Sequence, residues 1–336
     1  MTILGIETSC DETSAAVIRD GKLLSNIVSA QLFHQEFGGV VPELASRAHQ
    51  RLIVPVVEEA LKEAAVPKEE LDAVAAVYGP GLIGSLLVGL SFGKAMAMGL
   101  GVPFIGVNHM EAHIFSNLID EAKPNFPFVN LTVSGGHTQL VLVKDFFHYE
   151  LLGETIDDAA GEAFDKVGKM LGLGYPGGPN VDKAATQGNP AAVKFPRPFL
   201  EGKPFQFSFS GIKTSVLYYL KREGLEGKLI PANRLADICA GFQSAVVEVL
   251  VQKLIAAAKH FDVKDISIAG GVSANSELRA SAQRAANENG LRLLIPKLKF
   301  CTDNGAMVAM VGFEKLRTNV FSDLELTAEP NLALLG

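Results

Sequence analysis

The sequence of 336 residues contains no tryptophan and only three cysteines. Cys10, Cys239 and Cys301 are far apart and form no CxxC pair, which excludes a zinc knuckle and a disulfide framework. An excess of positive charge is also missing, since 30 Lys and Arg stand against 37 Asp and Glu, for a formal net charge of −7. This balance argues against a protein that binds nucleic acid through its whole surface, while a local basic patch is still compatible with it.

Long apolar runs are also absent. The longest apolar stretch, from Ala73 to Leu100, is broken by Gly79, Pro80, Gly81, Gly84 and Gly89, a loop that a membrane span would not carry in its middle. The first twelve residues have no basic region and turn acidic at once, which is unlike a secretory signal. We therefore predict a cytoplasmic protein with no membrane association.

Glycine, in contrast, is abundant, and it marks the turns of a plan that occurs twice. A strand, a tight polar turn and a second strand are predicted at Ile3–Ile6 with Ala15–Ile18, and again at Phe128–Val133 with Gln139–Val143. Each pair is followed later by a buried strand, a glycine loop, a helix and a further strand. These elements are Leu71–Val77, Leu86–Gly99 and Pro103–Val107 in the first half, and Asp265–Ala269, Ser276–Asn289 and Leu291–Ile295 in the second.

The repeated plan predicts an α/β protein of two lobes with duplicated α/β domains. The expected first lobe is residues 1–107 plus about 304–326, because a helix over Asn304–Leu316 is expected to return to it. The second lobe is expected to be 108–303. Residues of about 149–231 interrupt the repeat with amphipathic helices and Pro/Gly-rich loops, which indicates a helical insertion in the second lobe.

A histidine pair is the first feature that suggests chemistry. His109 and His113 stand four residues apart in the predicted helix NHMEAHIFSNLI, so both rings are on one face, within reach of one ion. The alternative is that these are two polar helix residues whose hydrogen bonds are made to neighbouring groups. In a zinc protease of the HExxH type the glutamate directly follows the first histidine, whereas Glu111 stands two residues on, about 200° around the helix. A peptidase site is therefore not favoured.

A third ligand is offered by Asp303, at the start of the last predicted helix. Helix capping is the simpler explanation of this residue when it is taken alone. Two histidines and one carboxylate form the set that holds Fe(II), Zn(II) or Mn(II) and leaves positions open for substrate.

Glycine loops and a charged helix complete the set of candidate features. VSGG at 133–136 and AGG at 269–271 each follow a strand, where bare N–H groups suit a phosphate or ribose, although a single such turn is usually only a turn. GPGLIGS lacks the GK[ST] of a Walker A loop. The predicted helix from Asp158 to Leu171 has a charged side that solvent exposure alone would explain, and the nest-like YPGGPN and Asp182 follow it.

The ordered motifs GIETSCDET, GGVVPELASRAH, HMEAH, VSGGHTQL, DDAAGEAFDKVGK, YPGGP, FSFSGIKT, AGGVSAN and CTDNGAM resemble those of the TsaD family. They run from Met1 to about Gly312, essentially the whole chain. The resemblance implies the two-lobed actin-like fold that Hsp70-type ATPases and sugar kinases share. It also implies an activity, transfer of the threonylcarbamoyl group of threonylcarbamoyl-AMP to N6 of the adenosine 3′ of the anticodon, position 37, in tRNAs that read codons beginning with A.

Site residues follow from the same resemblance. Metal ligands correspond to His109, His113 and Asp303, with one divalent metal per subunit, Fe²⁺ as the expected ion and Zn²⁺ as the alternative. Contacts to the adenylate correspond to Thr132, Val133, Ser134, Gly135, Gly136, Asp165, Gly178, Asp182 and Asn275. We hypothesise in addition that a carboxylate of the first loop, Asp11 or Glu12, assists proton removal from the adenine N6.

Partners are implied as well: tRNA, a TsaB-like paralogue and a TsaE-like ATPase. The apolar helix around Leu86–Met98 is a candidate partner surface, with packing inside the lobe as the alternative. Two other functions are weighed against the transferase. An ATP-dependent small-molecule kinase of the same fold would use acidic Mg²⁺ ligands and would not need the histidine pair, and a nucleotide-binding scaffold would not need an intact ligand set.

Overall fold

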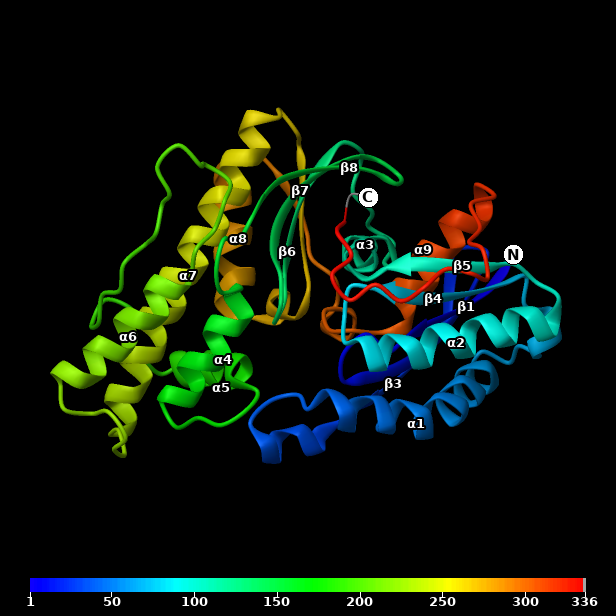
Figure 1. The fold of residues 1–336 in the computed structure, drawn as a ribbon. Coiled ribbons are helices and arrows are strands. Elements are labelled where there is room, and N and C mark those ends of the chain that lie inside the picture. Colours follow the sequence, from blue (N-terminus) through cyan, green and yellow to red (C-terminus); the bar gives the residue numbers. More distant parts are fainter. Residues whose placement is uncertain (335–336) are drawn as a thin grey trace. The chain divides into compact units, whose positions relative to one another are not determined.

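The computed structural model describes residues 1–334, and their contacts divide the chain into two compact units (Figure 1). Unit 1 is formed by Met1–Lys123 with Pro296–Gly336, and unit 2 by Pro124–Ile295. The expected lobes had their boundaries at residues 107 and 303 instead. The difference arises because residues 108–123 and 296–303 pack with the first sheet and its last helix. Both histidines and Asp303 therefore belong to unit 1, not to the second lobe.

Unit 1 is built on a five-stranded sheet with the order β3-β2-β1-β4-β5. Strand β1 is antiparallel to β2 and parallel to β4, so the first two strands form the predicted hairpin around the turn at residues 8–11. The strand at 22–30 was not among the predicted elements. The strands are β1 (Thr2–Glu7), β2 (Glu12–Arg19), β3 (Lys22–Ala30), β4 (Ala73–Gly79) and β5 (Phe104–Asn108).

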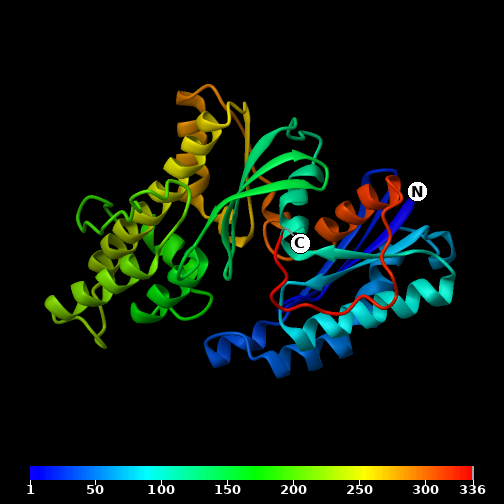
Figure 2. The same ribbon diagram turned by 45° about the horizontal axis from the view of Figure 1, so that its top comes forward.

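Helices cover both faces of this sheet (Figures 1 and 2). Helices α1 (Pro42–Glu63) and α2 (Ile83–Leu100) pack on one face, while α9 (Gly305–Arg317) packs on the other, beside the short α3 (His109–Phe115). The β1–α9 contact is very close, since a Cβ on Gly5 would lie 2.3 Å from the Ala309 nitrogen. Helix α9 thus lies in unit 1.

Unit 2 repeats the topology of unit 1. Its sheet has the order β10-β9-β6-β7-β8, so β6 takes the place of β1, and β9 the place of β4. Strand β6 is antiparallel to β7 and parallel to β9, as in the first sheet. The strands are β6 (Phe128–Val133), β7 (Thr138–Asp145), β8 (His148–Glu154), β9 (Asp265–Ala269) and β10 (Arg292–Leu294). The predicted duplication of an α/β plan is confirmed.

Five helices belong to unit 2. They are α4 (Ala160–Met170), α5 (Gly177–Ala185), α6 (Ser210–Arg222), α7 (Ala232–His260) and α8 (Ser276–Glu288). Helix α4 packs against both α5 and α6, and α5 and α6 also contact α7. The predicted insertion at 149–231 thus contains helices, but its first residues form strand β8, which pairs with β7. The remaining short helices are the 3-10 turns Leu32–Phe37, Lys68–Glu70, Ser116–Leu118, Gly271–Ala274 and Leu298–Phe300.

Two helices, α2 and α7, are long and apolar enough to pass a simple test for a membrane span. The apolar window of α7 is 83% buried, as in the core helix of a globular unit. The window of α2 is only 33% buried, because one side of this helix packs on β4 and α1 and the other side is exposed.

Residues 320–333 have no regular structure but follow the β4–β5 side of unit 1. The Glu329 N–H donates to the Tyr78 carbonyl at 2.7 Å, and the Ser322 N–H donates to the Phe104 carbonyl at 2.9 Å. The last of these contacts joins the Asn108 side-chain amide to the Ala333 carbonyl at 2.8 Å. The tail thus covers the end of β5, where the histidine helix begins.

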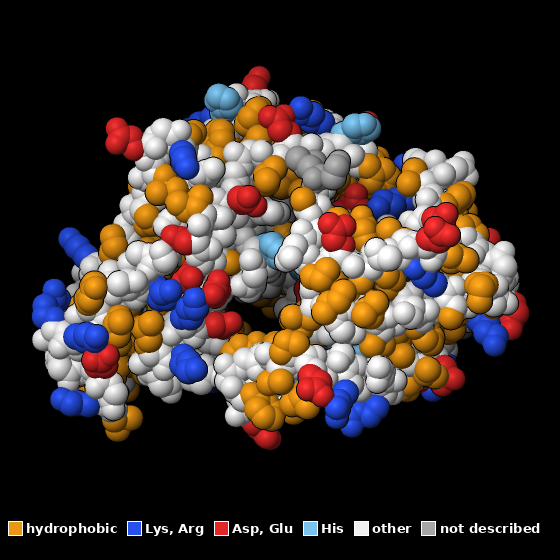
Figure 3. Space-filling model, in the orientation of Figure 1, with side chains coloured by type: hydrophobic (Ala, Val, Ile, Leu, Met, Phe, Trp, Pro, Cys, Tyr) orange, Lys and Arg blue, Asp and Glu red, His pale blue; other side chains and the backbone are white. Residues whose placement is uncertain are grey.

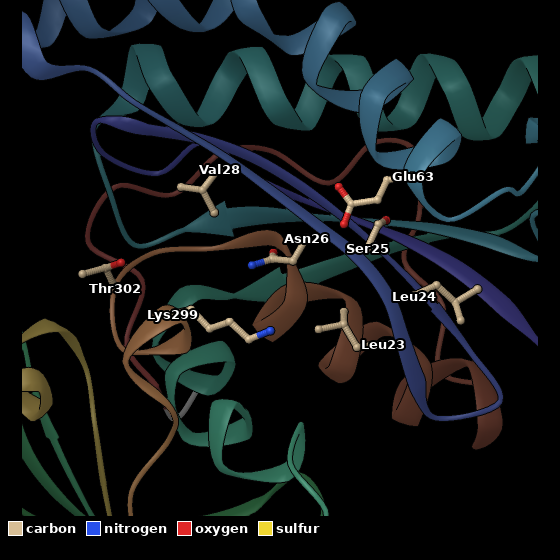
Figure 4. A pocket seen from close by; sticks show the side chains of 8 residues that line it. All are labelled: Leu23, Leu24, Ser25, Asn26, Val28, Glu63, Lys299 and Thr302. Atoms are coloured by element: carbon tan, nitrogen blue, oxygen red, sulfur yellow. The ribbon is translucent and has the colours of Figure 1, made fainter.

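A hollow of about 510 Å³ lies at the other edge of the same sheet, beside β3 (Figure 4). None of the predicted ligands or catalytic residues lines it, so we do not assign the chemistry to this hollow. Its lining residues are Leu23, Leu24, Ser25, Asn26, Val28, Glu63, Lys299 and Thr302.

Candidate metal centre and nucleotide site

The metal centre begins where β5 ends. Asn108, the last residue of the strand, caps α3, since its Oδ1 accepts the N–H groups of Met110 at 2.8 Å and Glu111 at 3.4 Å. This cap starts the helix at His109, so the first histidine lies in the first turn and His113 one turn later. The local sequence N-H-x-x-x-H therefore fixes both ligands relative to the end of a buried strand.

The two histidine rings lie together, with centroids 4.6 Å apart. Asp303 meets them from the turn before α9: its Oδ1 is 3.2 Å from His113 Nε2 and 3.6 Å from His109 Nε2. The possible ligand atoms of the three residues lie within 4.8 Å of one another. Asn304, and not Asp303, caps α9 by accepting the Met307 N–H, so the simpler explanation of Asp303 does not apply.

The environment of His113 fits a metal ligand. The side chain is fully buried, its Nδ1 has no hydrogen-bond partner among the described residues, and the Asp303 carboxylate lies near its Nε2 with no hydrogen bond between them. A buried polar atom without a partner costs about 1–3 kcal/mol, so such atoms need an explanation. An ion bound at Nε2 would satisfy one of them, and these three residues therefore fit a divalent metal.

Glu7 and Ser9 support His109 from the other side of the ring. His109 Nδ1 lies 3.1 Å from Glu7 Oε2 and 3.2 Å from Ser9 Oγ, and the Glu7 carboxyl is itself fully buried. A proton held on Nδ1 leaves Nε2 free to bind a metal, as is usual for histidine ligands. Burial lowers the pKa of His109, but the carboxylates of Asp303 and Glu7 outweigh it and raise the pKa to about 9.

Glu111 does not take part in this site. Its Oε2 pairs with Lys315 Nζ of α9 at 2.8 Å, on a different side of α3 from the histidines. The inference that Glu111 cannot act as the base of a metalloprotease thus agrees with the structure.

The β1–β2 turn brings Cys10, Asp11 and Glu12 to the same end of the sheet. His49 of α1 holds this turn, since its Nε2 is 3.0 Å from the Cys10 carbonyl and its Nδ1 is 2.8 Å from Thr13 Oγ1. Burial, with the charges of Asp303 and Asp11 adding to it, raises the pKa of Glu12 well above its usual range. Burial and the same two carboxylates also raise the pKa of the Cys10 thiol, so Cys10 is no nucleophile near neutral pH.

In unit 2 the glycine turn follows β6. The Ser134 N–H donates to the His137 carbonyl at 2.8 Å, and the Gly161 N–H at the start of α4 donates to the Ser134 carbonyl at 3.2 Å. A Cβ on Gly135 or Gly136 would meet nothing within 4 Å, and both residues are exposed. The backbone of this turn is thus open to a ligand.

Three predicted polar contacts each hold the start of a helix in this region. Asp165 Oδ1 accepts the N–H groups of Gly177 at 2.8 Å and Gly178 at 3.2 Å, at the start of α5. Asp182 accepts the N–H and the hydroxyl of Ser276, at the start of α8. Asn275 caps α8 and donates to Gln243. Asp165 thus ties the start of α5 to α4, and Asp182 ties the start of α8 to α5, while the Ser134 carbonyl ties the start of α4 to the end of β6.

Thr132 and Val133 differ from the other predicted contacts. Both are buried, because β6 is the central strand of its sheet and pairs with β7 and β9. The Thr132 hydroxyl donates to Asn130 at 2.7 Å, and its residue pairs with Gln139 and Ala269 on the two neighbouring strands. The accessible part of the predicted segment is Ser134–Gly136.

The sequence of residues 22–310 matches the family TsaD, tRNA N6-adenosine threonylcarbamoyltransferase. The chain belongs to the TsaD family. A relative of that name from Chloroherpeton thalassium is 56% identical over 94% of this chain and 92% of its own length. Another, from Christiangramia forsetii, is 50% identical over 98% of this chain and 97% of its own length. The chain is thus a tRNA-modifying transferase, and the kinase and the scaffold are set aside.

Solved structures show the fold of this TsaD family member. HypF from T. kodakarensis matches with a TM-score of 0.65 at 16% identity, over 95% of this chain and 48% of HypF. The activator of 2-hydroxyisocaproyl-CoA dehydratase from Clostridium difficile matches with a TM-score of 0.51 at 12% identity, over 95% of this chain and 97% of the activator. The predicted actin-like α/β fold is confirmed.

Sequence reasoning missed Glu7, Ser9 and Asn108 at the metal centre of this TsaD family member. Glu7 and Ser9 belong to the GIETSCDET motif, but only the loop residues Asp11 and Glu12 were singled out in it. Glu7 lies at the end of β1 and meets His109 about a hundred residues later, so no local spacing in the sequence indicates this contact. Asn108, in contrast, was readable, because Asn before a helix is a frequent N-cap.

Proposed function

We propose that this chain transfers the threonylcarbamoyl group of threonylcarbamoyl-AMP to N6 of adenosine 37 in tRNAs that read codons beginning with A, releasing AMP. The observation that carries the proposal is the cluster of His109, His113 and Asp303, in which the His113 side chain is fully buried, in a member of the TsaD family. We expect the enzyme to act in the cytoplasm.

His109, His113 and Asp303 would hold one divalent metal per subunit, with Fe²⁺ as the expected ion and Zn²⁺ as the alternative. When bound, such an ion supplies Lewis acidity toward a carbonyl oxygen and neutralises charge on a departing phosphate. Two histidines and one carboxylate leave coordination positions open for a substrate oxygen. Glu7 would keep His109 in the tautomer that binds through Nε2.

Residues of unit 2 would hold the adenylate part of the donor. Support comes from the open turn Ser134–Gly136, which lies beside the tied starts of α4, α5 and α8. Asp165 with Gly178, and Asp182 with Asn275, would fix the positions of these helix starts. Their role would thus be to hold these helix starts in place beside the turn, whose own backbone is open to the nucleotide, and Thr132 and Val133 would support the turn from within the sheet.

In the transfer, the bond from N6 to the carbamoyl carbon forms, the bond from that carbon to the phosphate oxygen breaks, and N6 loses one proton. We propose that Glu12 or Asp11 takes this proton. A general base works best when its pKa is near the working pH, and the raised pKa of Glu12 moves it in that direction.

Replacing the base should slow the chemical step. We expect at least one of Glu12→Gln and Asp11→Asn to lower the single-turnover rate by about 10²–10⁴-fold, the usual contribution of general-base catalysis. The measurement uses saturating donor and tRNA, with metal content as the control because both residues lie near the ligands. Full rates in both variants would exclude a base on this turn.

Reconstitution tests the function itself. The purified chain, with its partner proteins, is incubated with threonylcarbamoyl-AMP and unmodified tRNA, and the digested nucleosides are then analysed by mass spectrometry. Threonylcarbamoyladenosine in the complete mixture, and none without donor, is the expected result. Absence of this nucleoside with all partners present would overturn the assignment of donor and product.

We further propose that a TsaB-like paralogue covers the outer side of α1 and α2, and that a TsaE-like ATPase acts with the pair. Support comes from the large apolar side chains exposed on these neighbouring helices (Figure 3). They are Val54 on α1 and Ile83, Leu87 and Met98 on α2, each about half or more exposed. Exposed apolar patches of this kind mark protein interfaces.

Charge placed on this side should prevent assembly. We expect Leu87→Glu with Met98→Glu to weaken binding to the TsaB-like protein by at least about a hundredfold, as for central apolar anchors of interfaces. Gel filtration and calorimetry measure it, with Val28→Glu on β3 as the matched control. Equal affinity of the double variant and of the Val28→Glu control for the TsaB-like protein would reject α1 and α2 as the interface.

A further inference from the structure

The charge of the protein is divided unevenly along the chain. Unit 1 has 20 Asp and Glu against 12 Lys and Arg, a net −8, whereas unit 2 has 17 against 18, a net +1. Within unit 2, residues 166–234 have 4 Asp and Glu against 11 Lys and Arg, a net +7. A protein of net charge −7 thus contains one strongly basic segment.

This basic segment folds as one helical layer, formed by the end of α4, by α5 and α6, and by the first turn of α7. Lys and Arg side chains gather over α4–α6 in the space-filling view (Figure 3). Lys169 on α4, Lys183 on α5 and Lys228 before α7 are exposed, and none has an ion pair within residues 1–334. Like charges gathered on one surface repel one another and create a positive potential that attracts anions.

The acidic residues around this layer are already engaged. Asp157 accepts from Ser208 and Ser210 at the start of α6, and Asp158 pairs with Lys166 and Lys213. Glu223 pairs with Arg222 and Arg234. These carboxylates compensate the inner cations and leave the outer lysines uncompensated.

Aromatic rings accompany the charges at the α6–α7 end. The guanidinium groups of Arg222 and Arg234 lie over the Tyr219 ring, 5.3 and 5.4 Å from its centroid. The neighbouring Tyr218 is 65% exposed. Cations with exposed aromatic rings are typical of surfaces that bind RNA through phosphates and base stacking.

We propose that this helical layer is the docking surface for tRNA, with Lys169, Lys183 and Lys228 at the phosphate backbone. The proposal rests on the tRNA-modifying function of the chain, which requires a polyanion to bind an acidic protein. A polyanion binds where the local charge is positive, and residues 166–234 supply that charge. An acidic partner protein is the competing occupant, and the experiment below separates the two.

The test compares two triple variants with the same change of charge. The first is Lys169→Gln, Lys183→Gln, Lys228→Gln, and the matched control is Lys22→Gln, Lys68→Gln, Lys259→Gln, three exposed lysines outside the layer without ion pairs among the described residues. Binding of unmodified tRNA to the purified full chain is measured between 0.05 and roughly 0.5 M KCl, the range in which counterion release changes affinity strongly. The KM values for tRNA and for the donor are measured in the complete modification assay.

The first variant should bind tRNA about 30- to 100-fold more weakly at roughly 0.1 M KCl, with the log–log salt slope smaller by about 2, since each lost phosphate contact removes about 0.7–0.9. Its KM for tRNA should rise while its KM for donor stays the same. The control should change the affinity by less than about threefold.

Equal tRNA affinity and salt slope in both variants would overturn the proposal, and so would a loss of partner-protein binding with unchanged tRNA affinity. If the protein without substitutions makes no modified nucleoside at all, the proposed function fails, and not the docking surface. If the protein without substitutions modifies tRNA, and the first variant has the tRNA affinity and the KM for tRNA of the control, then only this docking surface is rejected.

Discussion

His113→Ala is expected to purify with no more than roughly a tenth of the metal that the unsubstituted chain binds, because one of three ligands is lost. Transfer should slow by at least about a thousandfold, since Lewis-acid stabilisation of a transition state contributes several kcal/mol. Asp303→Asn should behave in the same way, because an amide is a weak ligand and the substitution removes the one carboxylate that contacts both histidines. Elemental analysis and single-turnover rates measure the two effects separately.

Two further substitutions calibrate this result. Glu7→Gln keeps the shape of the side chain but weakens its hold on His109 Nδ1, so the metal affinity should fall about 10–100-fold, less than for a lost ligand. Glu111→Gln, which removes a partner of Lys315 on another side of α3, should retain the metal. Stoichiometric metal in His113→Ala would show that these residues are not the metal site.

Gly5→Ala should be among the most damaging single-atom additions to this chain. Its Cβ would lie 2.3 Å from the Ala309 nitrogen and 2.6 Å from the Ala309 Cα, so a β-strand and a helix backbone would have to separate. We expect a loss of at least about 3 kcal/mol in the free energy of unfolding. For a unit of this size the unfolding temperature would fall by roughly 6–12 °C, which calorimetry measures.

Gly99→Ala is the matched control for this substitution. Gly99 lies in α2, and a Cβ there would meet nothing within 4 Å. Alanine is the better helix former and should stabilise by about 0.5–1 kcal/mol. Metal content adds a second readout, because α9 follows Asp303 directly: Gly5→Ala should lower it and Gly99→Ala should not. Equal unfolding temperatures in the two variants would contradict the close β1–α9 packing.

The repeated strands were predictable because their turns carry strong local signals. Buried runs such as 128–133 and 265–269 are short, apolar and followed by glycine, so their limits follow from composition. The sequence did not predict strand β8, which falls in the expected helical insertion, because only one of its seven residues is buried and its apolar pattern is weak. The sequence could not predict the unit boundary at residue 123 either, since this boundary depends on which sheet α3 packs against.

At the candidate sites, the sequence predicted the geometry within one helix, but not the burial and the charges that come from distant parts of the chain. The i, i+4 spacing of His109 and His113 already placed both rings on one side, and excluded Glu111 from it. The burial of Thr132 and Val133 depends on the pairing of β6 with two strands, and in one of them the partner of Thr132 is Ala269, 137 residues later in the sequence. The raised pKa of Glu12 arises from its burial, to which the charge of Asp303 adds, and sequence position alone reveals neither.

The discontinuity of unit 1 has a consequence for biosynthesis. During translation both histidines are made before any of unit 2, whereas Asp303 follows the last residue of that unit, with 189 residues between it and His113. Domains tend to fold as they leave the ribosome, so unit 2 can complete its core while unit 1 still waits for α9. The nascent chain therefore cannot bring the three candidate ligands together early, so metal loading at the proposed site would be a late step that follows completion of unit 1.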